Sequence, residues 1–190
     1  MTRAAPTRIW LVRHGPTHAR TFVGRTDLPA DLSDTARLDR LAAALPDAPV
    51  VSSDLLRARA TADALARGRP RLPHEPDLRE FDYGAWENRA WDEIDDPNLR
   101  RFLEDPGDLR APGGESWNDL AARVTAAIDR LATPPDLIVV CHMGPILTQW
   151  ARATGLPPGR AVAQPVAPLS LTRIDLEAGG PVPVFADRHP

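Results

Sequence analysis

The sequence predicts an α/β fold in which a mainly parallel sheet is covered by helices on both faces. Two observations predict it: short apolar runs typical of strands recur along the chain, and segments with helical apolar spacing lie between most of them. At 190 residues the chain has the length of one domain, and its 21 prolines are dispersed rather than gathered in a linker. We therefore expect a single domain over residues 1–190.

The predicted elements follow one another with short connections. In chain order they are a strand at 9–12, a helix at 34–45, a strand at 50–52, helices at 55–66, 93–104 and 116–131, a strand at 137–141, a helix at 146–154, and strands at 169–176 and 182–186. The clearest helix begins at Ser116, which forms a capping box with Asp119. Within it Leu120, Val124 and Ile128 fall on one face, as they do in a helix that packs against a core.

Composition excludes several classes of function. A net charge of -3 gives no general attraction to nucleic acid or to anionic lipid. The longest apolar runs span only a few residues, and the N-terminal stretch lacks the apolar segment of a secretory signal, so we expect no membrane partner and a cytoplasmic location. The single cysteine, Cys141, excludes an internal disulfide and a thiolate metal cluster.

Two predicted strands each lead into a histidine. The run at 9–12 is followed by Arg13 and His14, and the run at 137–141 is followed by His142. In parallel α/β sheets, ligands bind at the carboxyl ends of strands. Pro16 and Pro145 follow shortly after, which predicts that both loops turn directly into helices. A helix N-terminus, an arginine and an imidazole together suit a phosphate group, although a solvent-facing turn at His14 and a buried core histidine at His142 are the alternatives.

The chain resembles the histidine phosphatase superfamily, also called phosphoglycerate mutase-like. The blocks that carry the resemblance are "RHGPT", "GRTDLP", "SSDLLRARATA", "LREFDYGAWE", "GGES" and "CHMG", in the order of the family. The resemblance implies a three-layer α/β/α sandwich with a six-stranded, mostly parallel sheet, in which the strands that end at the two histidines are neighbours. In length and in its blocks the chain is similar to the compact branch that includes α-ribazole phosphatases.

The resemblance also implies residue roles. His14 matches the nucleophile that forms a phosphohistidine, Arg13 and Arg57 match phosphate-binding arginines, Glu80 matches the proton donor, and His142 matches a second histidine of the phosphate pocket. These roles are chemically reasonable, because neighbouring cations keep an imidazole neutral and stabilise the charge of a transferring phosphoryl group. From the pattern alone, however, Arg57 could lie on a solvated helix face.

Glu80 is one of several acidic residues in its region, with Glu75, Asp77, Asp82 and Glu87, any of which could be an ordinary surface charge. Only the resemblance distinguishes Glu80 from the others.

Two further residues are candidates for binding substrate. Gly144 follows His142 closely, in the "CHMG" block. Arg20 stands where the family often has an asparagine, and it could bind a second anionic group or point to solvent. We expect no cofactor and no metal ion: His14 and His18 have the spacing of a helical zinc pair, but Gly15 and Pro16 between them oppose a continuous helix.

The most consistent interpretation is a phosphomonoesterase that acts on a small phosphorylated metabolite. The alternatives are phosphoglycerate mutase-type phosphoryl transfer and a non-catalytic module that binds a phosphorylated ligand. The short interval from Glu80 to His142 leaves little room for the covering insertion of the longer mutases, and this favours hydrolysis. The natural ester and the oligomeric state stay open, with a homodimer as one option.

Overall fold

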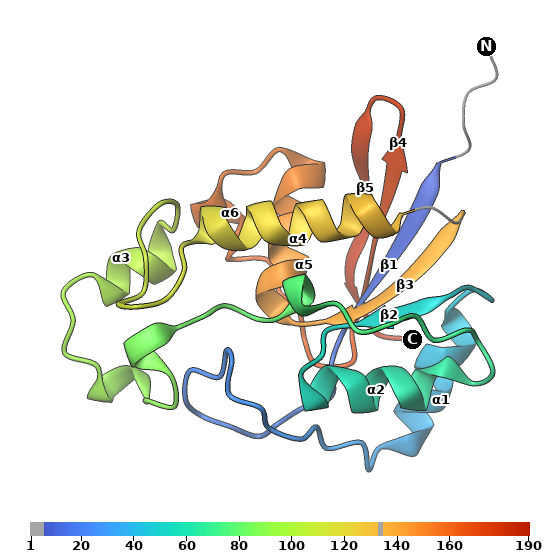
Figure 1. Ribbon diagram of the computed structural model, residues 1–190, viewed down its shortest axis with the longest axis horizontal. Coiled ribbons are helices and arrows are strands. Elements are labelled where there is room, and N and C mark those ends of the chain that lie inside the picture. The colour runs from blue at the N-terminus through green and yellow to red at the C-terminus, as the bar shows by residue number, and fades with distance from the viewer. Residues whose placement is uncertain (1–5, 133–134) are drawn as a thin grey trace.

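The computed structural model describes residues 6–132 and 135–190, and its centre is a sheet with the strand order β2-β3-β1-β4-β5 (Figure 1). The strands are β1 (Thr7–Arg13), β2 (Val50–Ser52), β3 (Asp136–Cys141), β4 (Leu171–Glu177) and β5 (Gly180–Arg188). β1 pairs in parallel with β3, and β3 with β2, whereas β4 runs antiparallel to both β1 and β5. The two strands that end at the predicted histidines are therefore neighbours, as expected.

The sheet has five strands within the described residues, not the six that the resemblance implied. The segment after α2 comes closest to a further strand: Arg71 forms an isolated parallel bridge with Val50, and Leu72 N–H donates to the Val50 carbonyl at 2.9 Å. Pro70 and Pro73 flank this bridge and have no N–H to donate. The pairing therefore stays limited to a few hydrogen bonds.

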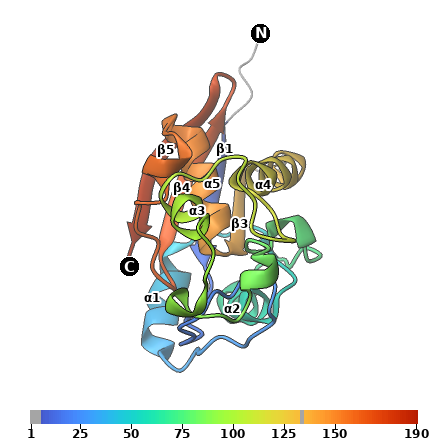
Figure 2. The same ribbon diagram turned by 90° about the vertical axis from the view of Figure 1, so that its left-hand side faces the viewer.

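Helices cover both faces of the sheet, which confirms the three-layer arrangement (Figures 1 and 2). The helices are α1 (Thr35–Ala44), α2 (Leu56–Ala66), α3 (Leu99–Glu104), α4 (Trp117–Leu131), α5 (Met143–Thr154) and α6 (Pro158–Ala161). The alternation of buried strand side chains divides the core in two: Val12 and Val140 pack with α1 and α2, while Leu11 and Val139 pack with α4 and α5. Each face of the sheet thus has its own apolar layer.

The local signals predicted some helix boundaries well. Ser116 is the N-cap of α4, with its hydroxyl accepting from Asp119 N–H at 3.2 Å and the Asp119 carboxylate accepting from Ser116 N–H at 2.8 Å. α5 begins directly after His142, with Pro145 in its first turn, as predicted.

Two helix predictions were wrong. The predicted helix at 93–104 is a 3₁₀ turn at Trp91–Glu93 followed by α3, because Pro97 disfavours helical backbone in the residue before it. No helix follows Pro16: residues 14–34 run without regular structure until α1. None of the helices in residues 6–132 and 135–190 is both long enough and apolar enough to cross a membrane.

The irregular segments gather at one end of the sheet. Residues 14–34, and the stretch from 79 through α3, lie beyond the carboxyl ends of β1 and β3 (Figure 1). Figure 2 looks from this side and shows α3 in the foreground. The sheet therefore presents its two histidines to a cover made of loops and short helical turns.

Candidate active site

The centre of the site is a pair of histidines on neighbouring strand ends. His14 N–H donates to the carbonyl of Cys141 at 3.0 Å, which continues the pairing of β1 with β3 by one residue. The two imidazole rings lie 5.0 Å apart between centroids, at 61° to each other. His14 is 6% exposed, and His142 is fully buried beneath it. The sheet register therefore brings together two residues that are far apart in sequence.

A hydrogen bond fixes the tautomer of His14. Its Nδ1 lies 2.6 Å from the carbonyl oxygen of Gly15, and since a carbonyl can only accept, Nδ1 carries the proton. Nε2 is then left with a free electron pair, to which Arg57 Nε donates at 3.2 Å. Burial and, secondarily, the positive charge of Arg57 lower the pKa of His14 to about 3. At neutral pH His14 is an uncharged imidazole with a nucleophilic nitrogen.

Arg57 extends from the first turn of α2 and is 1% exposed, although its sequence pattern alone allowed a solvated face. Besides the bond to His14, its two terminal nitrogens donate to the carbonyls of Thr26 at 2.8 Å and Gly24 at 2.7 Å. Gly15 N–H donates to the Thr61 hydroxyl at 3.0 Å, which ties the loop after β1 to α2. These bonds hold the guanidinium and the imidazole in a fixed relation.

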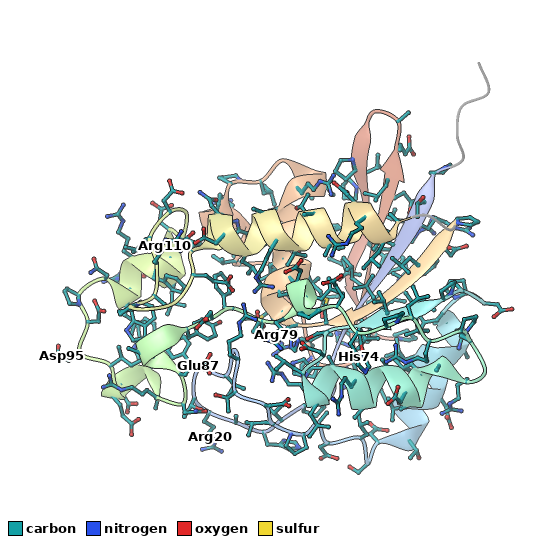
Figure 3. All side chains as sticks on the ribbon, viewed as in Figure 1. Arg20, His74, Arg79, Glu87, Asp95 and Arg110 are labelled. Carbon is teal, nitrogen blue, oxygen red and sulfur yellow. The ribbon has the colours of Figure 1, made fainter. Side chains whose placement is uncertain are left out.

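The loop of residues 24–26 is held from its other side by Glu87, a residue that the sequence interpretation did not assign to the site. The Glu87 carboxylate accepts from Arg25 N–H at 2.8 Å and from the Thr26 hydroxyl at 2.8 Å, and it also accepts from the N–H groups of Gly24 and Thr26. Glu87 is labelled in Figure 3. The available sequence signal was its place in the same block as Glu80, which does not separate it from the other carboxylates nearby.

Glu80 is buried as well, at 6% exposed. Its carboxylate accepts from Phe81 N–H at 2.9 Å and from Gly144 N–H at 3.0 Å. A Cβ at Gly144 would lie 2.3 Å from Oε1 of Glu80, so this approach requires glycine. We predicted Gly144 as a substrate-binding residue, and this stays a prediction; in the structure its N–H donates to Glu80.

Several buried polar atoms in the site have no hydrogen-bond partner among the described residues. They are Nε of Arg13 and both ring nitrogens of His142. Arg13 donates through one terminal nitrogen to the carbonyl of Val166 at 2.5 Å. Burial lowers the pKa of His142 well below its usual value, with a smaller effect from His14. Since buried polar groups are ordinarily hydrogen-bonded, this set is suited to a ligand with several acceptor oxygens.

Of these two residues, Arg13 lines a pocket of about 260 Å³. Of the predicted site residues, Arg13, His14, Arg57 and Glu80 line it, and His142 lies against the His14 ring. Arg20 does not line the pocket; it is exposed, and Figure 3 shows its side chain pointing away from the molecule. In the described part of the chain, no three His, Cys, Asp or Glu side chains are grouped so that they could hold a metal ion.

The chain is similar in sequence to known proteins. A bifunctional protein of Mycobacterium tuberculosis is 36% identical over 158 residues, which cover 76% of this chain and 43% of the relative, so the match spans less than half of that protein. The adenosylcobalamin/alpha-ribazole phosphatase of Salmonella typhimurium is 31% identical over 163 residues, covering 79% of this chain and 81% of the relative.

A solved structure shares the architecture. Bacillus stearothermophilus YhfR superposes with a TM-score of 0.84 at 25% identity, covering 96% of this chain and 98% of the other. The family description that matches this sequence runs from residue 9 to residue 187 and so contains every residue of the pocket. The chain accordingly belongs to the histidine phosphatase superfamily, branch 1.

Proposed function

We propose that this protein is a phosphomonoesterase that hydrolyses a small phosphorylated metabolite through a phosphohistidine on His14. The observation that carries the proposal is the fixed His14 tautomer: Nδ1 donates to the Gly15 carbonyl, so Nε2 keeps its electron pair toward the pocket lined by Arg13 and Arg57. An imidazole that is neutral and oriented before substrate binds can attack without first losing a proton.

In the first step, Nε2 of His14 attacks the phosphorus of the ester in line with the leaving oxygen. The N–P bond forms as the P–O bond to the substrate breaks. Arg13 and Arg57, which line the pocket, contribute positive charge to the phosphoryl oxygens. His142 lies against the His14 ring, its ring nitrogens have no hydrogen-bond partner among the described residues, and in this proposal it donates to one phosphoryl oxygen. Arg57 is then poised to transfer its Nε hydrogen bond from His14 to a phosphoryl oxygen.

The leaving alkoxide requires a proton, and Glu80 is the acidic group that lines the pocket. Protonated Glu80 would donate to this oxygen as the P–O bond breaks. In the second step the ionised carboxylate accepts a proton from water, the resulting oxygen nucleophile attacks the phosphohistidine, and inorganic phosphate leaves. The cycle returns Glu80 to its protonated state and His14 to its neutral form.

The relative named adenosylcobalamin/alpha-ribazole phosphatase supports hydrolysis of a small phosphate ester as the class of reaction. The family match over residues 9–187 supports treating residues 1–190 as one domain, which we propose acts on a small-molecule substrate, without nucleic acid or membrane and without a cofactor, and with a homodimer as one option.

The test is release of inorganic phosphate from a panel of phosphorylated metabolites. His14→Ala should lower the rate at least about 1,000-fold on every ester that the wild type hydrolyses, because the nucleophile is lost. His18→Ala is the matched control, since His18 is exposed and pairs with Asp31 at 2.8 Å. Equal inactivity of wild type and His14→Ala on the whole panel would favour a binding module. Rapid conversion of 3-phosphoglycerate with 2,3-bisphosphoglycerate into 2-phosphoglycerate, faster than any phosphate release, would favour a mutase.

A further inference from the structure

A second pocket, of about 410 Å³, lies beside the proposed phosphate pocket. Its walls are mainly apolar and aromatic, and they include Phe81, Tyr83, Phe102, Leu103, Trp117 and Met143. Tyr83, Leu103 and Met143 also line the phosphate pocket, so the two spaces share a wall. Gly144, whose N–H holds the Glu80 carboxylate, lines the apolar pocket as well. The proposed proton donor therefore lies close to the junction between the two pockets.

The aromatic side chains that line this pocket pack against one another. The rings of Phe81 and Tyr83 are stacked at 25° with centroids 5.5 Å apart, and Phe102 packs edge-on against Phe81 at 5.6 Å. Phe81, Phe102 and Trp117 are 7%, 3% and 3% exposed, so they are fixed by the core rather than free to rotate. A binding surface made of packed rings is formed before a ligand arrives, and little conformational freedom is lost on binding.

The charge of this pocket restricts what it can bind. Among the residues that line it, Glu104 is the one charged side chain, and it is 62% exposed and paired with Arg100 at 2.9 Å. No arginine or histidine of residues 6–132 and 135–190 lines the pocket, so a carboxylate or a second phosphate would find no counter-charge among them. Arg20, the residue that could have bound a second anion, points away from the site.

We propose that this pocket binds the leaving group of the substrate, and that this group is neutral and apolar or aromatic rather than anionic. The inference rests on the proposed phosphomonoesterase function, and it narrows the substrate class to phosphate esters of uncharged, hydrophobic alcohols. A small molecule is the fitting occupant because Tyr83, Leu103 and Met143 line both pockets, so the leaving group of an ester held at His14 would lie next to the apolar pocket. Phe102 and Leu103 of α3 form one side, which makes this short helix a determinant of leaving-group size.

The test uses straight-chain alkyl monophosphates from ethyl to heptyl, because their leaving alcohols differ little in acidity. If the chain enters the apolar pocket, kcat/KM should rise about threefold for each added methylene until the space is filled. The phosphate ester of a neutral alcohol should also have a kcat/KM at least about 10-fold higher than that of 3-phosphoglycerate, which is of similar size. The reason is that the carboxylate of 3-phosphoglycerate would lack a counter-charge in the apolar pocket.

Two variants act on this pocket alone. Val162→Asp should flatten the dependence on chain length while ethyl phosphate keeps its rate, because Val162 lines the apolar pocket and not the phosphate pocket. Val182→Asp, at a 40% exposed position of β5, is the matched control. Ala163→Trp, at an exposed position on the wall, should selectively lower the rates of the longest esters, and it keeps the test usable if Val162→Asp does not fold.

The outcomes are distinguishable. Hydrolysis of ethyl phosphate with no gain along the alkyl series, or a preference for 3-phosphoglycerate, would overturn the inference and leave the phosphomonoesterase proposal standing. Failure to hydrolyse any ester would overturn the phosphomonoesterase proposal itself. A graded gain that Val162→Asp abolishes and Val182→Asp preserves would support both.

Discussion

Glu87 and Arg57 hold the same three-residue loop from opposite sides. The Glu87 carboxylate accepts the N–H groups of Gly24, Arg25 and Thr26, and the Arg57 guanidinium donates to the carbonyls of Gly24 and Thr26. A Cβ at Gly24 would lie 1.8 Å from the Phe81 carbonyl oxygen and 2.4 Å from Glu87 Oε1, so this close approach requires glycine. Through this loop, Glu87 sets the position of the guanidinium that donates to His14, without touching the pocket.

We predict that Glu87→Gln lowers kcat/KM by about 10- to 100-fold, because a small displacement of a catalytic group is costly. An amide offers one acceptor oxygen where the carboxylate offers two, so some of the loop N–H groups lose their partner. Inhibition by vanadate should weaken in parallel, since it also depends on Arg57, whereas mere loss of folded protein would leave the inhibition constant unchanged. Glu93→Gln is the control, because Glu93 is exposed and accepts only from local groups. Unaltered kinetics in Glu87→Gln would contradict a positioning role.

Glu80→Gln should separate substrates by their leaving groups. We expect a loss of about 100- to 10,000-fold toward alkyl phosphates, whose leaving oxygen needs a proton, and a much smaller loss toward an aryl phosphate with an acidic phenol. Binding of a phosphate analogue should persist. Steady-state kinetics on matched alkyl and nitrophenyl esters provide the measurement, and equal losses on both would mean that Glu80 is structural.

Gly144→Ala should reproduce part of the Glu80→Gln phenotype. The added methyl would lie 2.3 Å from the Glu80 carboxylate, which must then leave its hydrogen bond to the residue 144 N–H. We expect a larger loss on alkyl than on nitrophenyl esters, measured on the same pair of substrates. Gly155→Ala, with nothing near its Cβ but with a φ of +70°, serves as a control for general destabilisation. A uniform loss on both esters in Gly144→Ala would argue against this link.

Acid should destabilise the folded protein over a pH range that is determined by its buried histidines. Burial lowers the pKa of His14 to about 3 and that of His142 well below its ordinary value, so both rings stay neutral in the fold while the unfolded chain takes up protons. Below pH 6.5 the unfolded state binds more protons, and stability therefore falls as pH falls, by up to about 1.4 kcal/mol per pH unit for each histidine.

Urea unfolding at pH 7, 6 and 5 measures this effect. Replacement His142→Gln should make the fall between pH 7 and pH 5 smaller by about 1–2 kcal/mol, because one buried titrating ring is removed. A slope that is the same in His142→Gln and in the wild type would mean that His142 takes up protons equally in the folded and unfolded states, which would contradict this prediction.

Chelation should not abolish activity, because the arginines of the pocket can themselves neutralise phosphoryl charge. We expect the rate after dialysis against EDTA to stay within about twofold of the untreated rate. Loss of activity in proportion to chelator, with recovery on adding zinc or magnesium, would refute this prediction.

The sequence predicted the positions of the two histidines well because each position depends only on neighbouring residues in the chain. A buried strand is an apolar run that can be read directly, and the polar residues that immediately follow the run must lie at the strand end. The positions of His14 and His142 therefore follow from β1 and β3. The capping box of α4 is equally local. Strand order cannot be read from the local sequence. Only the resemblance predicted that the two histidines lie side by side.

The parts that could not be predicted depend on contacts between distant segments. Glu87 differs from its acidic neighbours because its carboxylate accepts hydrogen bonds from the loop at 24–26, about 60 residues earlier in the chain. No spacing of residues in the sequence predicts that contact. The apolar pocket likewise needs α3, α5 and the loop after Glu80 in one place. The missing helix after Pro16 shows the same limit: proline permits a helix start, but the chain there bonds to Thr61 and to Asp31 instead.

The position of the two histidines at the ends of β1 and β3 determines how the protein would lose activity on heating. β1 is paired on both sides, and its amides should exchange with solvent only through global unfolding, so the His14–His142 pair persists as long as the fold does. Glu80 and the loop at 24–26 belong to segments without regular structure, which open at lower free energy. Inactivation should therefore precede melting of the sheet, and within that interval the protein would be inactive yet fully recoverable on cooling.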